Sequence, residues 1–169
     1  MPELLPEVDE NDNIIAIHPR KLLKELKFRH RAALIIPKTK DNKIILAKRA
    51  KDKYPFPDVW CCAIGGKVQA HETYEQAALR EMQEEGNLTS KLQLIVTSPF
   101  ENTEEKNIAH IFTTIEEIPV SNFQPELSEV QYFQAFSIKE AQKLITENPE
   151  NFAPSFRVHF KRFIEELKK

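Results

Sequence analysis

The segment Gly65–Leu88, GGKVQAHETYEQAALREMQEEGNL, carries most of the information in this 169-residue sequence. It contains all three glycines of the chain, Gly65, Gly66 and Gly86, where average usage would give about 12. A chain that avoids glycine elsewhere is expected to keep it where the backbone needs a geometry that side chains do not tolerate. The segment is therefore the first place to look for a functional site.

A helix is predicted in the middle of this segment. Thr73 and Gln76 form a capping-box pair, and good helix formers continue to Glu85. Gly86 and Asn87 end the helix, because asparagine also adopts the left-handed conformation of a C-cap.

Three carboxylates of this helix, Glu81, Glu84 and Glu85, are spaced i, i+3 and i+4 and therefore share one face. Like charges at this spacing destabilise a helix. A hard divalent cation such as Mg²⁺, which prefers oxygen ligands, would offset that repulsion. The alternative is an acidic face that is simply solvated.

The spacing of the whole segment favours the metal site. Gly66, Glu72, Arg80, Glu81 and the Glu84-Glu85 pair fit the pattern G-x5-E-x7-R-E-(apolar)-x-E-E. A chance match in this chain is on the order of 10⁻⁴. The pattern resembles the Nudix box, and the chain is similar to Nudix proteins over most of its length. The resemblance implies an α/β/α sandwich around a mixed β-sheet, and hydrolysis of a diphosphate linkage with Mg²⁺ or Mn²⁺.

The resemblance also implies a role for each matched residue. Glu84 and Glu85 match direct metal ligands, and Glu81 matches a carboxylate that binds metal or accepts a proton from water. The carbonyl of Gly65 is a further expected ligand. The residues expected to hold the loop against the helix are Gly66, Glu72 and Arg80.

Flanking segments resemble one branch of the superfamily, which contains type I isopentenyl-diphosphate isomerase and its hydrolase relatives. Phe28–Ala32, Lys48–Trp60 and Asn151–Phe156 carry this resemblance. The isomerase needs a cysteine where Gly65 stands and a histidine ligand where Lys67 stands. We therefore predict a hydrolase of a nucleoside diphosphate derivative or similar small molecule. An isomerase-like enzyme and a non-catalytic nucleotide-binding domain stay as alternatives.

Residues outside the motif are candidates for substrate and metal contacts. Arg49, Lys53 and Lys67 are predicted to bind the diphosphate, against the alternative of ordinary exposed basic residues. Glu126 is predicted as an additional metal ligand, with Glu129 as the weaker candidate of the same loop.

Composition excludes several other classes. The 24 basic and 26 acidic residues give a net charge of −2, which does not favour binding of a nucleic-acid polymer. No apolar run approaches the ~18 residues of a membrane span, and no signal peptide is recognised. Adjacent Cys61 and Cys62 do not suit a disulfide, so a reducing cytoplasm is expected. A small-molecule diphosphate is the expected partner, and a homodimer stays open.

The element order predicts a single domain over residues 1–169, with helices packed on a mixed sheet. An N-terminal hairpin and short helix are expected over about 1–29, and C-terminal helices over about 137–168. Residues 31–37 and 43–48 are expected to pair as a hairpin, and 59–64 to form one short strand. Further strands are predicted at 91–97, 108–115 and 130–133.

Overall fold

The computed structural model describes residues 1–169 and is built around a four-stranded mixed sheet of order β6-β3-β8-β7. Its two central strands run parallel and its outer pairs are antiparallel. The strands are β3 (His30–Ile35), β6 (Ile64–Lys67), β7 (Leu92–Glu101) and β8 (Lys106–Thr114).

A second, antiparallel sheet of order β5-β4-β9 lies beside the first. Its strands are β4 (Ile44–Arg49), β5 (Trp60–Cys62) and β9 (Val130–Phe136). The mixed sheet was predicted, and this separate three-stranded sheet was not.

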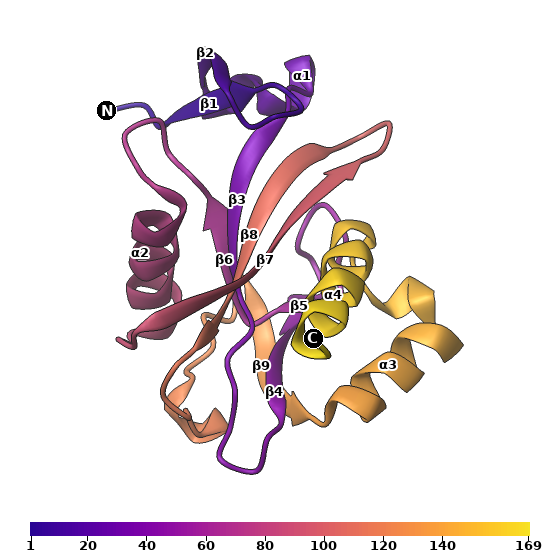
Figure 1. The fold of residues 1–169 in the computed structure, drawn as a ribbon. Helices are drawn as coiled ribbons and strands as arrows, with labels where there is room; N and C mark the ends of the chain where they lie inside the picture. The colour runs from indigo at the N-terminus through magenta and orange to yellow at the C-terminus, as the bar shows by residue number, and fades with distance from the viewer.

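The N-terminal region forms the expected hairpin and short helix at one end of the molecule (Figure 1). The hairpin consists of β1 (Leu4–Val8) and β2 (Ile14–Pro19). One 3₁₀ turn, η1 (Arg20–Leu22), leads into α1 (Leu23–Leu26), and further turns are η2 (Val120–Asn122) and η3 (Pro149–Asn151).

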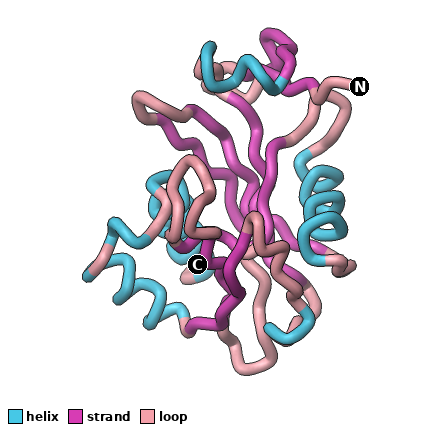
Figure 2. The backbone as a smooth tube through the Cα atoms, turned by 180° about the vertical axis from the view of Figure 1, so that it is seen from behind, coloured by secondary structure: helices cyan, strands magenta, loops and turns pink.

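Helices cover both faces of the sheets, which confirms the predicted α/β/α sandwich (Figures 1 and 2). Helix α2 (Tyr74–Gly86) packs on one face, and α3 (Ile138–Glu147) and α4 (Pro154–Leu167) on the other. The predicted capping box of Thr73 with Gln76 is present, and Ser137 with Glu140 forms a second one at the start of α3. Asn87 is the left-handed C-cap of α2. Local capping thus fixes the helix starts as the sequence indicated.

The predicted hairpin of residues 31–37 and 43–48 is wrong. Strands β3 and β4 belong to different sheets, and only the isolated bridge between Lys38 and Ile44 joins the two arms. Strand β3 ends at Ile35, and Pro37 soon after it has no backbone N–H to donate to a neighbouring strand. Strand β3 pairs instead with β6 and β8, and both of its faces are covered.

The single strand predicted at 59–64 is divided in two. Strand β5 pairs with β4, whereas β6 pairs with β3, and the buried residue Ala63 lies between them. The chain therefore crosses from one sheet to the other immediately before Gly65 and Gly66. This crossing places both glycines in the mixed sheet, next to α2.

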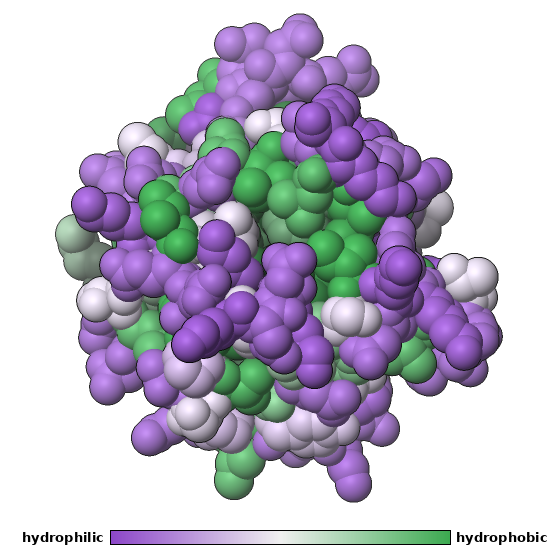
Figure 3. Space-filling view, turned by 60° about the horizontal axis from the view of Figure 1, so that its bottom comes forward, coloured by the Kyte–Doolittle hydropathy of each residue, from purple (hydrophilic) through white to green (hydrophobic).

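The surface is mostly hydrophilic. Figure 3 shows the lower end of the molecule, where apolar residues gather in a recessed area among hydrophilic side chains. No helix of the structure is both long and apolar enough to cross a membrane.

The apolar side of α4 supports the fold on the face opposite α2. Phe156, Phe160, Phe163 and Ile164 are at most 3% exposed, and consecutive phenylalanine rings stack along the helix. Leu167, at the end of the same stripe, is 44% exposed.

We expect Phe163→Ala to lower the free energy of unfolding by about 3–5 kcal/mol, because it leaves a cavity in a packed core. Leu167→Ala on the same helix is the control and should cost well under half as much. Urea unfolding followed by circular dichroism measures both. Equal effects of the two substitutions would contradict the packing described.

Candidate active site

The two adjacent glycines of β6 lie at a tight corner between the sheet and α2. A Cβ on Gly66 would overlap the carboxylate of Glu81, and a Cβ on Gly65 would lie 2.8 Å from Leu34 Cδ2. Neither glycine has a positive φ. Close approach, rather than an unusual backbone conformation, is therefore the reason for glycine here, which corrects the interpretation from composition.

Arg80 connects the helix to the loop and strand before it. Its Nε and Nη2 donate to the two carboxylate oxygens of Glu72 at 2.5 and 3.0 Å. Nη1 donates to Glu81 at 2.7 Å and to Glu84 at 3.2 Å, and Nη2 also donates to the carbonyl of Lys67 at 3.2 Å. One guanidinium thus holds three carboxylates and the strand backbone.

Glu72 completes the junction from the loop side. Its second oxygen accepts the backbone N–H of Gln69 at 2.9 Å, and its side chain is only 7% exposed. Burial opposes the charged form of Glu72, but the hydrogen bonds from Arg80 and Gln69 outweigh it and lower the pKa. The predicted structural roles of Glu72 and Arg80 agree with this geometry.

Glu81 and Glu85 are one helical turn apart and both point to the glycine corner. The backbone N–H of Gly65 donates to Glu85 at 3.3 Å, while Glu81 lies against Gly66. Burial raises the pKa of Glu81 despite the nearby Arg80, and Glu84 raises it further. Glu85 is exposed on its solvent side, but desolvation by the surrounding protein raises its pKa. The charge of Glu81 raises the pKa of Glu85 further. Carboxylate groups are therefore concentrated at this corner, and neighbouring cations do not fully offset the cost of charging them.

This donor set fits a hard divalent cation. Carboxylates on one helix face and the backbone of Gly65 are all oxygen donors at one corner, which suits Mg²⁺ or Mn²⁺. In the structure, no three acidic side chains lie close enough together to bind a cation. Hydrogen bonds from Arg80 hold Glu81 and Glu84 in their present positions. Glu84 is the exposed member of this pair.

The two acidic residues of the loop before β9, Glu126 and Glu129, have different partners. Glu129 is paired with Lys53, and the charges of both residues act on the pKa of Glu85. Glu126 bonds only within its own loop, accepting from Ser128 at 3.2 Å and through its carbonyl from Val130. The sequence contains no signal that distinguishes Glu129 from Glu126, because the ion pair between Glu129 and Lys53 depends on how the loop folds.

The other basic candidates lie in different settings. Arg49 donates to the carbonyls of Pro55 and Phe56, at 2.7 and 2.9 Å, and so braces the loop before β5. Lys67 follows Gly66 in β6, so its side chain lies on the sheet face opposite α2. It has no ion-pair partner, and burial lowers its pKa. Lys53 is the candidate that the fold brings near Glu85.

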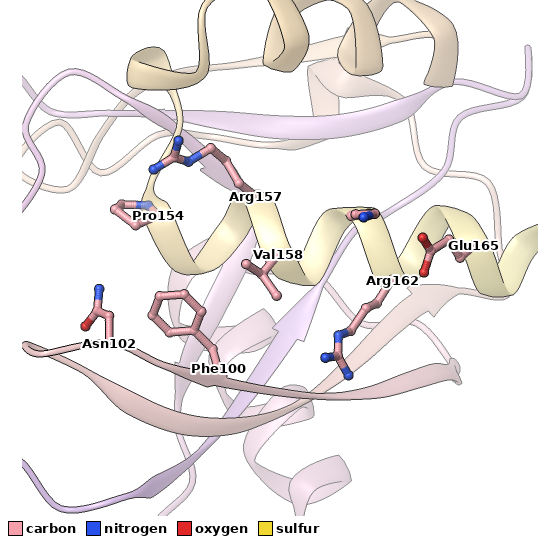
Figure 4. A pocket seen from close by; sticks show the side chains of 8 residues that line it. Phe100, Asn102, Pro154, Arg157, Val158, Arg162 and Glu165 are labelled. Atoms are coloured by element: carbon pink, nitrogen blue, oxygen red, sulfur yellow. The ribbon is translucent and has the colours of Figure 1, made fainter.

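One hollow of the molecule lies away from the motif residues. It is an open depression of about 740 Å³ between α4 and β7, lined by residues such as Phe100, Arg157 and Arg162 (Figure 4). It contains none of the motif residues, because α4 and α2 lie on opposite faces of the sheet.

Comparison with known proteins identifies the family. The model of the NUDIX domain matches residues 28–156, which include β3, the glycine corner, α2 and the start of α4. The chain belongs to the Nudix family, and it is a hydrolase whose motif carboxylates are complete.

Individual relatives agree with this assignment. A prenyl-diphosphate phosphatase of Methanosarcina mazei is 29% identical over 156 residues, covering 91% of each chain. An isopentenyl-diphosphate Delta-isomerase of Serratia proteamaculans is 25% identical, covering 92% of this chain and 88% of its own. A crystal structure of a Deinococcus radiodurans protein superposes with a TM-score of 0.80 at 19% identity, covering 95% of this chain and 98% of its own. The predicted branch is thus confirmed.

We expect Arg80→Ala to destabilise the protein by about 1–3 kcal/mol, because it leaves the buried Glu72 carboxylate without its charged donor. Lys143→Ala, which removes an exposed ion pair with Glu147, is the control and should cost less than about 0.5 kcal/mol. Thermal unfolding by calorimetry compares the two variants. An Arg80 variant as stable as the control would contradict the proposed junction.

Proposed function

We propose that the glycine corner is a metal-dependent hydrolytic site for the diphosphate of a small organic molecule. The observation that carries this proposal is the meeting of Glu81 and Glu85 at Gly65 and Gly66. Glu81, Glu84, Glu85 and the Gly65 carbonyl would hold Mg²⁺ or Mn²⁺. The loop before β9 would add a carboxylate, from Glu126 or, by its position, Glu129.

The bound cation would neutralise charge on the phosphate oxygens and make water a better nucleophile. Water attacks one phosphorus, a new P–O bond forms, and the bond from that phosphorus to the bridging oxygen breaks. One carboxylate among Glu81, Glu84 and Glu85 accepts the proton lost by water.

Two substrate classes are proposed, an isoprenoid diphosphate and a nucleoside diphosphate derivative. The relative named a prenyl-diphosphate phosphatase, similar over nearly the whole chain, supports the first class. Lys53, beside Glu85, is the basic residue best placed for the diphosphate. Lys67 and Arg49 remain proposed contacts, with Arg49 acting also through the loop that it braces.

An isomerase-like activity is the second candidate, favoured by the similarity to an isopentenyl-diphosphate Delta-isomerase. Gly65 and Lys67 stand where the isomerase resemblance calls for a cysteine and a histidine. Without the cysteine, the chain lacks the acid–base group that the isomerase uses. Hydrolysis is therefore preferred.

The remaining proposals concern the state of the protein in the cell. We infer that residues 1–169 act as one Nudix domain, with residues 1–29 and 137–168 as extensions that pack on it. The adjacent Cys61 and Cys62 are both free thiols, which suits a cytoplasmic protein. A homodimer stays a proposal for the assembly of the chain.

We expect Glu85→Gln and Glu84→Gln each to lower metal-dependent phosphate release by at least about 100-fold, because the amide does not replace the charge that holds the cation. Glu75→Gln, on the exposed start of α2, is the control and should leave activity unchanged. Calorimetric titration with Mn²⁺ gives a second readout, in which both site variants bind the ion more weakly. Full turnover in the Glu85 variant would exclude the proposed site.

A substrate panel with Mg²⁺ should separate the candidate activities. We expect phosphate release from isopentenyl, geranyl or farnesyl diphosphate, or from a nucleotide panel, and no dimethylallyl diphosphate from isopentenyl diphosphate. Phosphate assays and mass spectrometry of the products make the comparison. Formation of dimethylallyl diphosphate would instead establish the isomerase.

A further inference from the structure

Two arginines of the chain, Arg157 and Arg162, make no side-chain hydrogen bond within the protein, and both line the depression between α4 and β7 (Figure 4). Each of the other five arginines donates to a carboxylate or to a backbone carbonyl, as Arg80 does. Lys161 lines the same depression and has no ion-pair partner either. Three unpaired cations are therefore gathered in one depression.

Arg157 carries a donor that no protein atom satisfies. Its Nε is buried and has no hydrogen-bond acceptor, which costs free energy. The guanidinium extends toward Pro154 at the start of α4 (Figure 4). This helix end has no capping side chain and no acidic residue in its first turn, so its partial positive charge adds to the charge of Arg157.

The depression also has an apolar wall. The ring of Phe100, from β7, lies near Val158 of α4 (Figure 4). The buried ring of His159 packs edge-on against Phe100, with the ring centroids 6.0 Å apart. Both ring nitrogens of His159 are hydrogen-bonded, to Ser98 at 2.7 Å and to Asn107 at 3.1 Å. A rigid, buried layer thus holds the Phe100 ring in place.

Asn102 provides a polar group beside this wall. Its side-chain oxygen accepts the backbone N–H groups of Glu104 and Glu105, at 2.8 and 2.7 Å, which fixes the orientation of the amide. Its Nδ2 donates to no protein atom, and the side chain lines the depression next to Phe100 (Figure 4). A neutral hydrogen-bond donor is therefore available at the edge of the aromatic ring.

The lining defines the charge and size of a fitting ligand. The three cations and Glu165, the one acidic residue of the lining, leave a net charge of +2, whereas a phosphate monoester carries about −1.5 to −2 at neutral pH. The volume of about 740 Å³ is within the range of small-molecule sites, ~300–1,000 Å³. Glu165 lies at one end of the depression and Glu104 follows Asn102 at the other, so a long polyanion would meet acidic residues at both ends.

We propose that this depression binds the phosphate monoester of a planar ring system, with a nucleoside monophosphate as the fitting ligand. Arg157, Lys161 and Arg162 would hold the phosphate. The ring would lie against Phe100, and Asn102 would donate to a polar atom at its edge. The site is separate from the glycine corner, because α4 and α2 cover opposite faces of the sheets (Figure 1). A phosphate monoester also has no diphosphate linkage to hydrolyse.

Calorimetric titration of the full chain with AMP, in EDTA so that no divalent metal is bound, tests the site. We expect saturable binding that Lys161→Glu and Arg162→Glu each weaken at least about tenfold, because each substitution replaces an attraction with a repulsion. Lys143→Glu, a matched charge reversal at a 74% exposed side chain of α3, is the control and should bind AMP as the wild type does. Circular dichroism verifies that all variants are folded.

A ligand series separates the phosphate from the ring. We expect ribose 5-phosphate, which lacks the base, and adenosine, which lacks the phosphate, each to bind at least about fivefold more weakly than AMP. Phe100→Leu should weaken AMP binding by a similar factor and leave ribose 5-phosphate unaffected, because leucine fills space without offering a flat face. Glu85→Gln should bind AMP normally, since the glycine corner plays no part.

Several outcomes would overturn the proposal. They are a chain that does not bind AMP, α4 variants that bind AMP as the wild type does, and loss of AMP binding in Glu85→Gln, which would place the nucleotide at the glycine corner. Equal affinities for AMP and ribose 5-phosphate would exclude the ring contact. An oligoadenylate that binds more tightly than AMP would show that the depression takes a polymer instead.

Discussion

The guanidinium of Arg80 is the interaction on which the site depends. Glu72 from the loop, Glu81 and Glu84 from α2 and the carbonyl of Lys67 from β6 all accept hydrogen bonds from it. A lysine would offer no planar fork for both oxygens of Glu72. Because Arg80 ties the three parts together, α2 is held at the distance where Glu81 meets Gly66.

That contact defines the geometry of the proposed site. The mixed sheet supplies a backbone corner with no side chains, and α2 supplies carboxylates that point into it. The carboxylates and the glycine backbone are therefore positioned by a helix and a strand, and the depression beside α4 lies on the other face. Burial raises the pKa of Glu81 and of Glu85, and neighbouring carboxylates raise both pKa values further, which is the counterpart of their affinity for a cation.

The crossing at Ala63 links the fold to the site. One segment contributes β5 to the antiparallel sheet and β6 to the mixed sheet, so Cys62 and Gly65 pack together at the junction. The same division separates β3 from β4. Two apolar segments joined by a turn look like a hairpin in the sequence. In the structure, β3 and β4 bury their apolar side chains in different sheets.

The sequence by itself determined the helices, the motif and the family. Capping boxes and the i, i+3, i+4 spacing of Glu81, Glu84 and Glu85 depend on residues within about one helical turn, so they can be recognised without any tertiary contact. Tertiary structure alone decided which sheet each strand joins and that Glu129, rather than Glu126, pairs with Lys53. It also decided that the glycines serve close approach. These features depend on contacts between distant segments, whose geometry local propensity does not specify.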